Sequence, residues 1–225
     1  GDVYKRQVSY SKNTAIGQAS VKITGKGLYK GTKTVNFNIR PATVTKLKVS
    51  STGEKSVKLS WKKVTGADSY AIYRYDSTSK KWQRIKTVKA VSFTDSGLAR
   101  AKGYSYKVKA VKKSGGKEYI SASYSKAIEA VTKPAKASCT AKSAGSGSIE
   151  VSWKAVGGAS GYEIYSSSNG SDYVKSAKVG GSQKSAIVSG FEPYSLRMVK
   201  VRAYKTVNGK TSYGAFSQAA MVIVR

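Results

Sequence analysis

The chain has 225 residues, and its 41 Lys and Arg residues outnumber its 11 Asp and Glu residues, which gives a formal net charge of +30 at pH 7. The lack of histidine excludes Ser-His-Asp and Cys-His catalysis and removes the commonest metal ligand, while the single cysteine, Cys139, excludes an intrachain disulfide. Because hydrophobic residues make up 40% of the sequence, we expect a folded chain whose positive charge attracts polyanions.

The beginning of the chain predicts a β-hairpin. Residues 19–24 and 34–39 alternate between apolar and polar side chains, and a glycine turn at 25–27 separates them. Residues 1–7 follow no such pattern, so we leave them out of the fold prediction. Because two or three strands are marginally stable alone, the hairpin reads as part of a larger domain.

A known repeat has a similar end. Tyr29 and Gly31, followed by Val35, Phe37 and Ile39 on one strand face, resemble the end of a bacterial immunoglobulin-like surface repeat. The resemblance implies that this first segment is a partial repeat whose other half lies upstream.

The rest of the sequence repeats itself. Residues 61–73 return 92 residues later as 153–165, and both copies begin with Trp and end with Tyr-x-Ile-Tyr. Residues 107–110 return as 200–203 at a spacing of 93. This period is too long for a solenoid repeat and is close to the size of a small domain. We therefore predict two copies of one domain.

Two prolines mark the predicted domain borders. Pro41 and Pro134 each follow an alternating run, and a strand should end there because proline cannot donate to a β-ladder. The predicted domains are residues 1–41, 42–132 and 133–225. Short linkers favour a semi-rigid array, which we expect to be monomeric.

Strand signals recur regularly in each copy, as in a β-sandwich. The first copy predicts strands at 44–50, 56–62, 69–75, 82–87, 91–95, 103–112 and 118–129. The second copy predicts strands at 137–142, 147–154, 161–167, 172–178, 184–189, 196–206 and 211–224. Gly-Gly at 115–116 and Asn-Gly at 169–170 and 208–209 predict tight turns. No segment has a long helical period, so the predicted fold class is all-β.

The two copies resemble fibronectin type III domains of bacterial extracellular proteins. The resemblance rests on Trp61 and Trp153, on the Tyr-x-Ile-Tyr strand after each, and on the later Val-x-Ala strand. Leu98 and Tyr104 have the spacing of the family's tyrosine corner, whereas Arg197 replaces that tyrosine in the second copy, where we expect no corner hydrogen bond. The resemblance implies tandem immunoglobulin-like, fibronectin type III β-sandwiches behind an N-terminal partial β-hairpin. It also implies an extracellular or cell-surface protein whose signal peptide was lost upstream.

The sequence contains no motif for catalysis, for a metal or for a cofactor, and we expect none of the three. The eleven acids are scattered, and neither a phosphate-binding Gly-x-x-x-x-Gly-Lys-Ser/Thr loop nor a calcium-loop spacing occurs. No apolar stretch reaches the length of a membrane span. For Cys139 we favour a small hydrophobic residue on a strand over a reactive thiol.

Lysines alternate with apolar residues along several predicted strands, which places them on the solvent face of a half-buried sheet. Matched strands of the two copies would form a basic stripe that binds a polyanion with avidity. The candidate residues are Lys107, Lys109, Lys112, Lys113, Lys200, Arg202 and Lys205. The alternative is that these side chains only keep the sheets soluble and prevent edge-to-edge association.

Aromatic residues supply a second set of candidates. Trp82 and Tyr173 begin the fourth predicted strand of each copy beside basic residues, where stacking on a glycan or cation–π contact is a functional interpretation. The alternative is ordinary packing on an edge strand. We expect Tyr73 and Tyr165, like the two repeated tryptophans, to pack in the core.

These features predict a non-catalytic spacer or adhesion array that contacts a cell-wall polymer or a glycan by charge. The alternative from another class is an accessory module of a secreted hydrolase that degrades polysaccharide or peptidoglycan, with its catalytic domain upstream. A third interpretation is nucleic-acid binding. We expect no specific nucleic-acid partner, because the basic charge is spread out and the motifs of nucleic-acid readers are absent.

Overall fold

The computed structural model describes residues 5–225, and it contains β-strands and turns with no helix in that range. The all-β fold class is therefore confirmed. No helix in the described range is long and apolar enough to cross a membrane.

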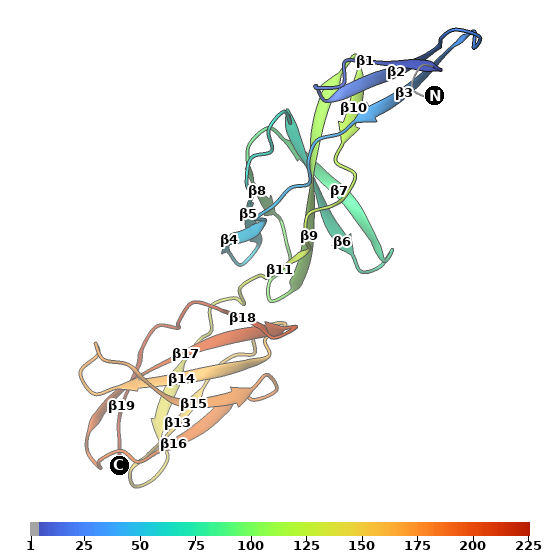
Figure 1. Cartoon of the computed structure of the whole chain (residues 1–225). Helices are drawn as coiled ribbons and strands as arrows, with labels where there is room; N and C mark the ends of the chain where they lie inside the picture. Colours follow the sequence, from blue (N-terminus) through green and yellow to red (C-terminus); the bar gives the residue numbers. More distant parts are fainter. Residues whose placement is uncertain (1–4) are drawn as a thin grey trace. The chain divides into compact units, whose positions relative to one another are not determined.

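The first segment is a three-stranded antiparallel sheet. Its strands, in the order β1-β2-β3, are β1 (Arg6–Ser11), β2 (Gly17–Gly25) and β3 (Thr32–Ile39) (Figure 1). The predicted hairpin corresponds to β2 and β3, while β1 was not predicted. Leaving out residues 1–7 was wrong for Arg6 and Gln7, which pair with Gly25 and Thr24. Residues 1–4 lie outside the described residues.

One face of this sheet carries its apolar side chains. Val21 pairs with Val35 and Ala19 pairs with Phe37, so the alternation predicted for β3 is confirmed. Val35 and Phe37 remain 45% and 38% exposed, so this apolar face is only partly covered. Its likeness to half of a bacterial immunoglobulin-like repeat stays a prediction.

The first repeat forms two antiparallel sheets. The three-stranded sheet, in the order β4-β5-β8, contains β4 (Lys48–Thr52), β5 (Ser56–Ser60) and β8 (Ser92–Ser96). The larger sheet has the order β10-β9-β6-β7, and β11 also pairs with β9. Its strands are β6 (Ser69–Asp76), β7 (Lys81–Val88), β9 (Gly103–Ser114), β10 (Lys117–Ile120) and β11 (Ile128–Val131) (Figure 1).

The second repeat has the same topology strand for strand. Its three-stranded sheet, in the order β12-β13-β16, contains β12 (Thr140–Ser143), β13 (Ser148–Ser152) and β16 (Ser185–Ser189). Its larger sheet contains β14 (Gly161–Ser167), β15 (Val174–Gly180), β17 (Leu196–Val207), β18 (Lys210–Tyr213) and β19 (Ala220–Ile223). The order is β15-β14-β17-β18, with β19 also paired to β17. The duplication that the period predicts is thus present in three dimensions.

Residues from both sheets of the second repeat form one buried cluster. Ile149 of the smaller sheet and Ile164 and Val201 of the larger sheet belong to this cluster, as does Trp153, and all four are at most 6% exposed. Burial of such side chains from water is the dominant favourable term in folding. The corresponding residues of the first repeat, including Val57 and Ile72 as well as Trp61, are buried to the same degree.

The repeated sequence signature is a packing and hydrogen-bonding unit. The hydroxyl of Tyr70 accepts a hydrogen bond of 2.8 Å from the backbone N–H of Val64, and Tyr162 accepts one of 2.7 Å from Val156. The tyrosine rings also pack on the repeated tryptophans, with centroid separations of 5.4 and 5.1 Å. A buried tyrosine hydroxyl needs a hydrogen-bond partner, and the backbone N–H of the valine supplies it in both copies. The same spacing of Trp, Val and Tyr is therefore found in each repeat.

The tyrosine corner is present in the first repeat only. The backbone N–H of Ala99 donates to the hydroxyl of Tyr104 at 2.9 Å, as the resemblance implies. In the second repeat the guanidinium of Arg197 lies 4.9 Å from the ring centroid of Phe191. Its Nε is buried and has no hydrogen-bond partner among the described residues. The expected departure at this position is therefore confirmed.

The last predicted strand of each repeat is interrupted, which corrects the continuous strands predicted over 118–129 and 211–224. The hydroxyl of Ser125 accepts a hydrogen bond from the N–H of Val108, and that of Ser217 accepts one from Val201, each at 3.0 Å. A side-chain oxygen here satisfies the N–H that a continuous ladder would pair with a carbonyl, so the strand separates into two.

Two of the three predicted tight turns connect consecutive strands directly. Asn208 and Gly209 have φ of 49° and 76°, and Gly115 and Gly116 have φ of 56° and 75°. These values match the left-handed conformation that a two-residue type I′ hairpin requires at both positions. The third turn is longer, because the side chain of Asn169 accepts hydrogen bonds from the backbone of Ser171 and Asp172 in a loop before β15.

Contacts between Cα atoms group the chain into two compact units. The first contains residues 1–48, 59–93 and 105–128, and the second contains residues 49–58, 94–104 and 129–225. These units do not separate at the two prolines, and the borders of the predicted domains 1–41, 42–132 and 133–225 stay a prediction.

Candidate binding face

The outward side of the larger sheet carries the candidate basic residues of the first repeat. Along β9, Tyr106 and Val108 are fully buried, while Lys107 and Lys109 alternate with them and are partly exposed. Alternation along a strand therefore directs both lysines away from the core. The neighbouring strand β6 places Tyr73 opposite Lys107.

Aromatic rings surround the two ammonium groups. The Nζ of Lys107 lies 4.3 Å from the ring centroid of Trp82 and 5.3 Å from that of Tyr124. The Nζ of Lys109 lies 4.2 Å from the same Tyr124 ring and donates a hydrogen bond of 3.1 Å to the carbonyl of Ala122. We call Lys107, Lys109, Trp82 and Tyr124 the repeat-one face.

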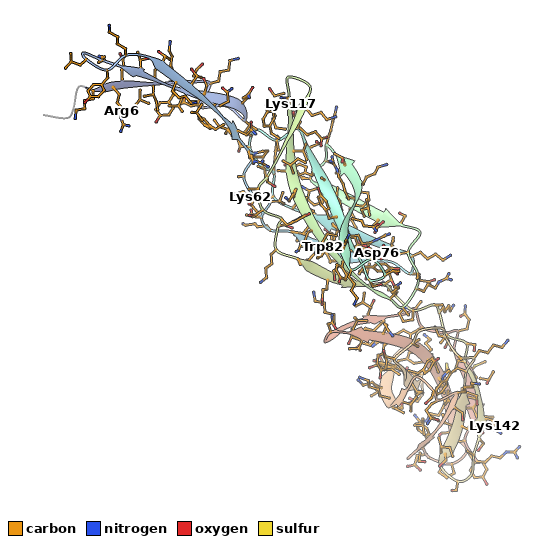
Figure 2. All side chains as sticks on the ribbon, turned by 90° about the vertical axis from the view of Figure 1, so that its right-hand side faces the viewer. Arg6, Lys62, Asp76, Trp82, Lys117 and Lys142 are labelled. Atoms are coloured by element: carbon orange, nitrogen blue, oxygen red, sulfur yellow. The ribbon has the colours of Figure 1, made fainter. Side chains whose placement is uncertain are left out.

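Trp82 is positioned by the hairpin that joins β6 and β7. It pairs with Tyr75, and their ring centroids are 5.4 Å apart. Figure 2 labels Trp82 and Asp76 near each other at this end of the sheet. The carboxylate of Asp76 accepts hydrogen bonds from the backbone N–H groups of Ser79 and Thr78. These two bonds, and that from Ser79 most strongly, lower the pKa of Asp76. The ordered turn thus holds the start of β7 beside Lys107.

Tyr73 and Tyr165 do not lie in the core, which corrects the prediction for both. Each follows a buried isoleucine in the strand, is partly exposed, and pairs across the sheet with Lys107 or Lys200. A β-bulge occurs immediately before each tyrosine in the pairing with the next strand. Burial, and then the neighbouring Tyr124, raises the pKa of Tyr73, so this phenol stays protonated.

An ion pair on this side of the larger sheet includes an arginine that is not among the predicted binding residues. Arg84 of β7 forms a 3.0 Å ion pair with Glu118 of β10 and also donates to the hydroxyl of Thr87. The hydrogen bond from Arg84 lowers the pKa of Glu118. Because Glu118 is engaged here, it does not neutralise Lys107 or Lys109.

The second repeat reproduces the lysine–aromatic contact. The Nζ of Lys200 lies 4.0 Å from the ring centroid of Tyr173. By the repeat alignment Lys200 corresponds to Lys107 and Tyr173 to Trp82, so the two sets of candidates meet at equivalent places. The structure shows no ion pair to either lysine within residues 5–225.

Arg202 has a different environment from the other candidates. Its guanidinium donates to the Glu163 carboxylate at 2.7 Å and to the hydroxyl of Tyr165 at 2.9 Å. It also lies 4.2 Å from the Tyr213 ring centroid and 4.8 Å from that of Phe216. This arginine is therefore held inside a cluster of aromatic rings around an acid.

Glu163 is a buried carboxylate on an otherwise outward-facing position. Its side chain is 2% exposed and also pairs with Lys175 at 3.4 Å. Burial raises the pKa of Glu163, but the hydrogen bond and charge of Arg202, together with Lys175, outweigh it and leave the pKa lowered. We call Glu163, Arg202, Tyr165, Tyr213 and Phe216 the repeat-two cluster. The sequence does not predict that Glu163 is buried, because the alternation of side chains along its strand places it on the outward face with the exposed acids.

The remaining candidates do not join these surfaces. Lys112 forms a 2.9 Å ion pair with Asp68, whose pKa is lowered first by that hydrogen bond. Lys113 lies 4.0 Å from Glu118. Lys205 alternates with Arg202 along β17 and pairs with Ser212, so it is directed to the other side of the sheet. Of the seven predicted residues, the structure thus brings Lys107 and Lys109 together in the first repeat and Lys200 and Arg202 onto the equivalent strand of the second, and a binding role for any of the seven stays a prediction.

Cys139 packs against the core of the second repeat, with its sulfur 3.6 Å from the carbonyl of Val199. Burial raises the pKa of its thiol, which disfavours the reactive thiolate and supports the interpretation as a small hydrophobic residue. Within the part of the chain that the structure describes, no three His, Cys, Asp or Glu side chains gather in a metal-binding arrangement.

The geometry favours charge recognition over bare ring stacking. The ammonium groups of Lys107 and Lys200 lie over Trp82 and Tyr173, where a sugar would otherwise stack. A cation over an aromatic ring at an exposed site gains about 0.5–1 kcal/mol, which orders the lysine without neutralising it. The arrangement therefore presents a localised positive charge on an aromatic support. The glycan-stacking role of Trp82 and Tyr173 stays a prediction.

Comparison with known proteins gives one sequence relative and a set of structural neighbours. No family model matches the chain. A poly(3-hydroxybutyrate) depolymerase of Ralstonia pickettii is 40% identical over 100 residues, which are 44% of this chain and 18% of that protein. The chain thus spans less than a fifth of the length of the relative it matches.

Two solved structures of similar architecture are tandem fibronectin type III segments. A two-domain segment of chicken tenascin aligns with a TM-score of 0.48 and 18% identity, covering 83% of this chain and 100% of that one. The FN1–FN3 domains of chicken CNTN1 align with a TM-score of 0.42 and 17% identity, covering 92% of this chain and 76% of that one. The strand orders show that the two repeats are β-sandwiches of one topology, each with a three-stranded and a larger antiparallel sheet.

Proposed function

We propose that this chain is a non-catalytic array of an extracellular bacterial protein that contacts an anionic polymer of the cell wall, or an anionic glycan, through its basic, aromatic-supported faces. The observation that carries the proposal is the recurrence of one contact, Lys107 on Trp82 and Lys200 on Tyr173, at equivalent places in both repeats. An ammonium kept over a ring and away from carboxylates is available to an external anion.

Charge supports this proposal at two ranges. The net charge of +30 attracts a polyanion from a distance and speeds encounter, an effect that salt screens. The two lysine–aromatic contacts supply short-range positions, and their repetition lets a long polymer bind at two points with a gain in avidity. Specific binding therefore requires the local contacts in addition to the overall charge.

Extracellular placement and the spacer role belong to the same proposal. The resemblance of both repeats to fibronectin type III domains, their shared sandwich topology and the depolymerase relative support an extracellular bacterial parent protein. Two β-sandwiches joined by a short connection are suited to separating functional parts of such a protein. We expect the array to act as a monomer.

A second candidate function is supported by the relative itself. Over 100 residues the chain is 40% identical to a protein named as a poly(3-hydroxybutyrate) depolymerase. This chain would then be an accessory module of a secreted hydrolase, with the catalytic domain elsewhere in the longer protein. Binding to the neutral polyester instead of to an anionic polymer would favour this second function.

The test is a binding panel with the full chain at low and physiological salt. The immobilised partners are a phosphodiester wall polymer, a sulfated glycan, a neutral glycan, poly(3-hydroxybutyrate) granules and duplex DNA. We expect saturable binding to one anionic carbohydrate or wall polymer that persists at physiological salt. Equal binding to every polyanion that disappears with salt would contradict the proposal, as would a preference for DNA.

Charge-matched variants separate the faces from the net charge. Lys107→Gln with Lys200→Gln removes two charges from the candidate faces, while Lys112→Gln with Lys205→Gln removes two charges elsewhere. We expect about a tenfold loss of affinity for the first pair, because each lost contact is worth about 0.5–1 kcal/mol, and less than a twofold change for the second. Equal losses would show that only net charge matters.

A further inference from the structure

The two repeats differ at one position in the centre of their outward faces. Ala71 of β6 lies opposite Lys109, whereas Glu163 of β14 lies opposite Arg202. Both residues occupy the same place in the repeated motif, between the core tyrosine and the core isoleucine. One repeat therefore supplies an internal carboxylate to the base beside it, and the other supplies a methyl group.

This difference decides which base is available. Arg202 donates hydrogen bonds from its Nε and one terminal nitrogen to Glu163, at 3.0 and 2.7 Å, and its guanidinium packs against aromatic rings. Lys109 has no carboxylate partner in the described structure and uses one of its three N–H donors on the carbonyl of Ala122. The second repeat thus closes a site that the first leaves open.

In the first repeat two ammonium groups share one ring. Lys107 and Lys109 lie 5.3 and 4.2 Å from the centroid of Tyr124. In the second repeat the equivalent ring is Phe216, which has no hydroxyl and contacts the already paired Arg202. Lys200 is left there as a single charge on Tyr173.

Building on the proposed polymer binding, we propose that the repeat-one face is the anion-binding site of the array, that Glu163 closes the corresponding face of the second repeat, and that the favoured ligand is a phosphodiester-bearing polymer. The pair of lysines around Tyr124 forms the site, and Trp82 holds Lys107 in place. The second repeat contributes structure and a weaker contact at Lys200.

The chemistry of the bases selects the ligand class. The planar fork of arginine matches carboxylates and phosphates, and Arg202 already uses two of its donors on one oxygen, Oε2, of Glu163. Lysine is a compact point charge with rotatable donors and a common phosphate ligand. Two lysines that contact one tyrosine ring present point charges without a fixed planar fork, which suits a tetrahedral oxyanion better than a planar carboxylate.

Single substitutions at equivalent positions test the assignment in the full chain. The probe is a phosphodiester wall polymer, and a polyuronate and a sulfated glycan of matched charge density distinguish the sources of the anion. We expect Lys107→Gln and Lys109→Gln each to weaken phosphodiester binding about fivefold, and Lys200→Gln to change it less than twofold. The wild-type chain should bind the polyuronate at least about fivefold more weakly.

An exchange of the central residue provides the reciprocal test. Ala71→Glu places a carboxylate opposite Lys109 and should weaken binding about as much as Lys109→Gln, while Ala71→Gln, of similar size and without charge, should weaken it less. Ala71 is fully buried, so circular dichroism must show that each variant folds, and Lys109→Gln carries the test if Ala71→Glu does not.

The outcomes separate this inference from the proposed function. Equal losses for Lys107→Gln and Lys200→Gln would leave polymer binding intact and overturn the assignment to the first repeat. Tighter binding of the polyuronate or of the sulfated glycan would overturn the ligand class. No loss with any of these lysine variants would contradict the proposed function as well.

Discussion

At the scale of single residues, Glu163 shows how a charged side chain can serve structure. The carboxylate is 2% exposed, and two bases satisfy it across neighbouring strands. Removing one partner of such a pair costs more than the pair itself contributes, because the other partner is left without compensation. The repeat-two cluster is therefore expected to stabilise the second repeat as long as it is complete.

Replacing Glu163 by Gln should lower the free energy of unfolding by about 1.5–3 kcal/mol, the range for hydrogen bonds to charged groups. Urea unfolding followed by circular dichroism measures this change. Glu150→Gln is the control, because Glu150 pairs with Lys142, which is 75% exposed, and should cost less than about 1 kcal/mol. Equal effects of the two substitutions would contradict the structural role of the cluster.

The same residue predicts a pH dependence of stability. Because the folded pKa of Glu163 is lowered, the unfolded chain binds more protons between the folded value and the ordinary value of about 4.3. The stabilisation is thus fully present above about pH 5 and is lost as the pH falls through the folded pKa. Thermal unfolding of the wild type from pH 6 to 3 should show this loss, and Glu163→Gln should flatten it. A parallel decline in both proteins would rule out Glu163 as its source.

At the scale of secondary-structure elements, a serine in each repeat lets the last strand break without leaving a buried donor unpaired. Ser125 and Ser217 accept the N–H groups of Val108 and Val201, which are fully buried. The interruption also brings Tyr124 and Phe216 onto the outward faces, where they contact Lys109 and Arg202. The break in the strand is therefore part of how each face is built.

Ser125→Ala should destabilise the first repeat by about 1–3 kcal/mol, because the N–H of Val108 loses its partner in a buried place. Amide hydrogen exchange at Val108 should accelerate in this variant. Ser123→Ala, at an exposed position of the same connection, is the control and should change stability by less than about 0.5 kcal/mol. Unchanged protection at Val108 would mean that another group satisfies the N–H.

The elements also show where sequence reasoning succeeds and where it stops. Alternation and the repeat of Trp61 to Tyr73 predicted the two sandwiches, because core faces have a fixed period along a strand. The same alternation gave no indication that Arg84 reaches Glu118, since these residues are 34 positions apart on strands at opposite edges of the order β10-β9-β6-β7.

The candidate site was predicted in separate parts for the same reason. Lys107 and Trp82 are both candidates, but for two different ligand contacts, and their proximity depends on β6 pairing with β7 on one side and with β9 on the other. Tyr73 is expected in the core on the grounds that it shares a face with the packing partners of the second strand, but alternation places it on the side of the sheet opposite the buried Ile72, where it pairs with Lys107. Local sequence predicts faces, while neighbours across strands require the fold.

At the scale of the whole molecule, a strongly basic chain raises the question of whether charge alone explains binding. General attraction depends on net charge and falls with salt for every polyanion alike. Binding through the repeat-one face depends on two particular lysines, and it should distinguish polymers of equal charge density. Salt and ligand chemistry together therefore separate the two explanations.

The decisive measurement is the dissociation constant of the full chain for a phosphodiester wall polymer at physiological salt, for the wild type and for the paired variants Lys107→Gln/Lys109→Gln and Lys112→Gln/Lys113→Gln. Each pair removes two charges from the same strand. We predict about a tenfold or greater weakening for the first pair and less than about a threefold change for the second. Equal weakening, or no measurable binding by the wild type at this salt concentration, would contradict a binding role for the face.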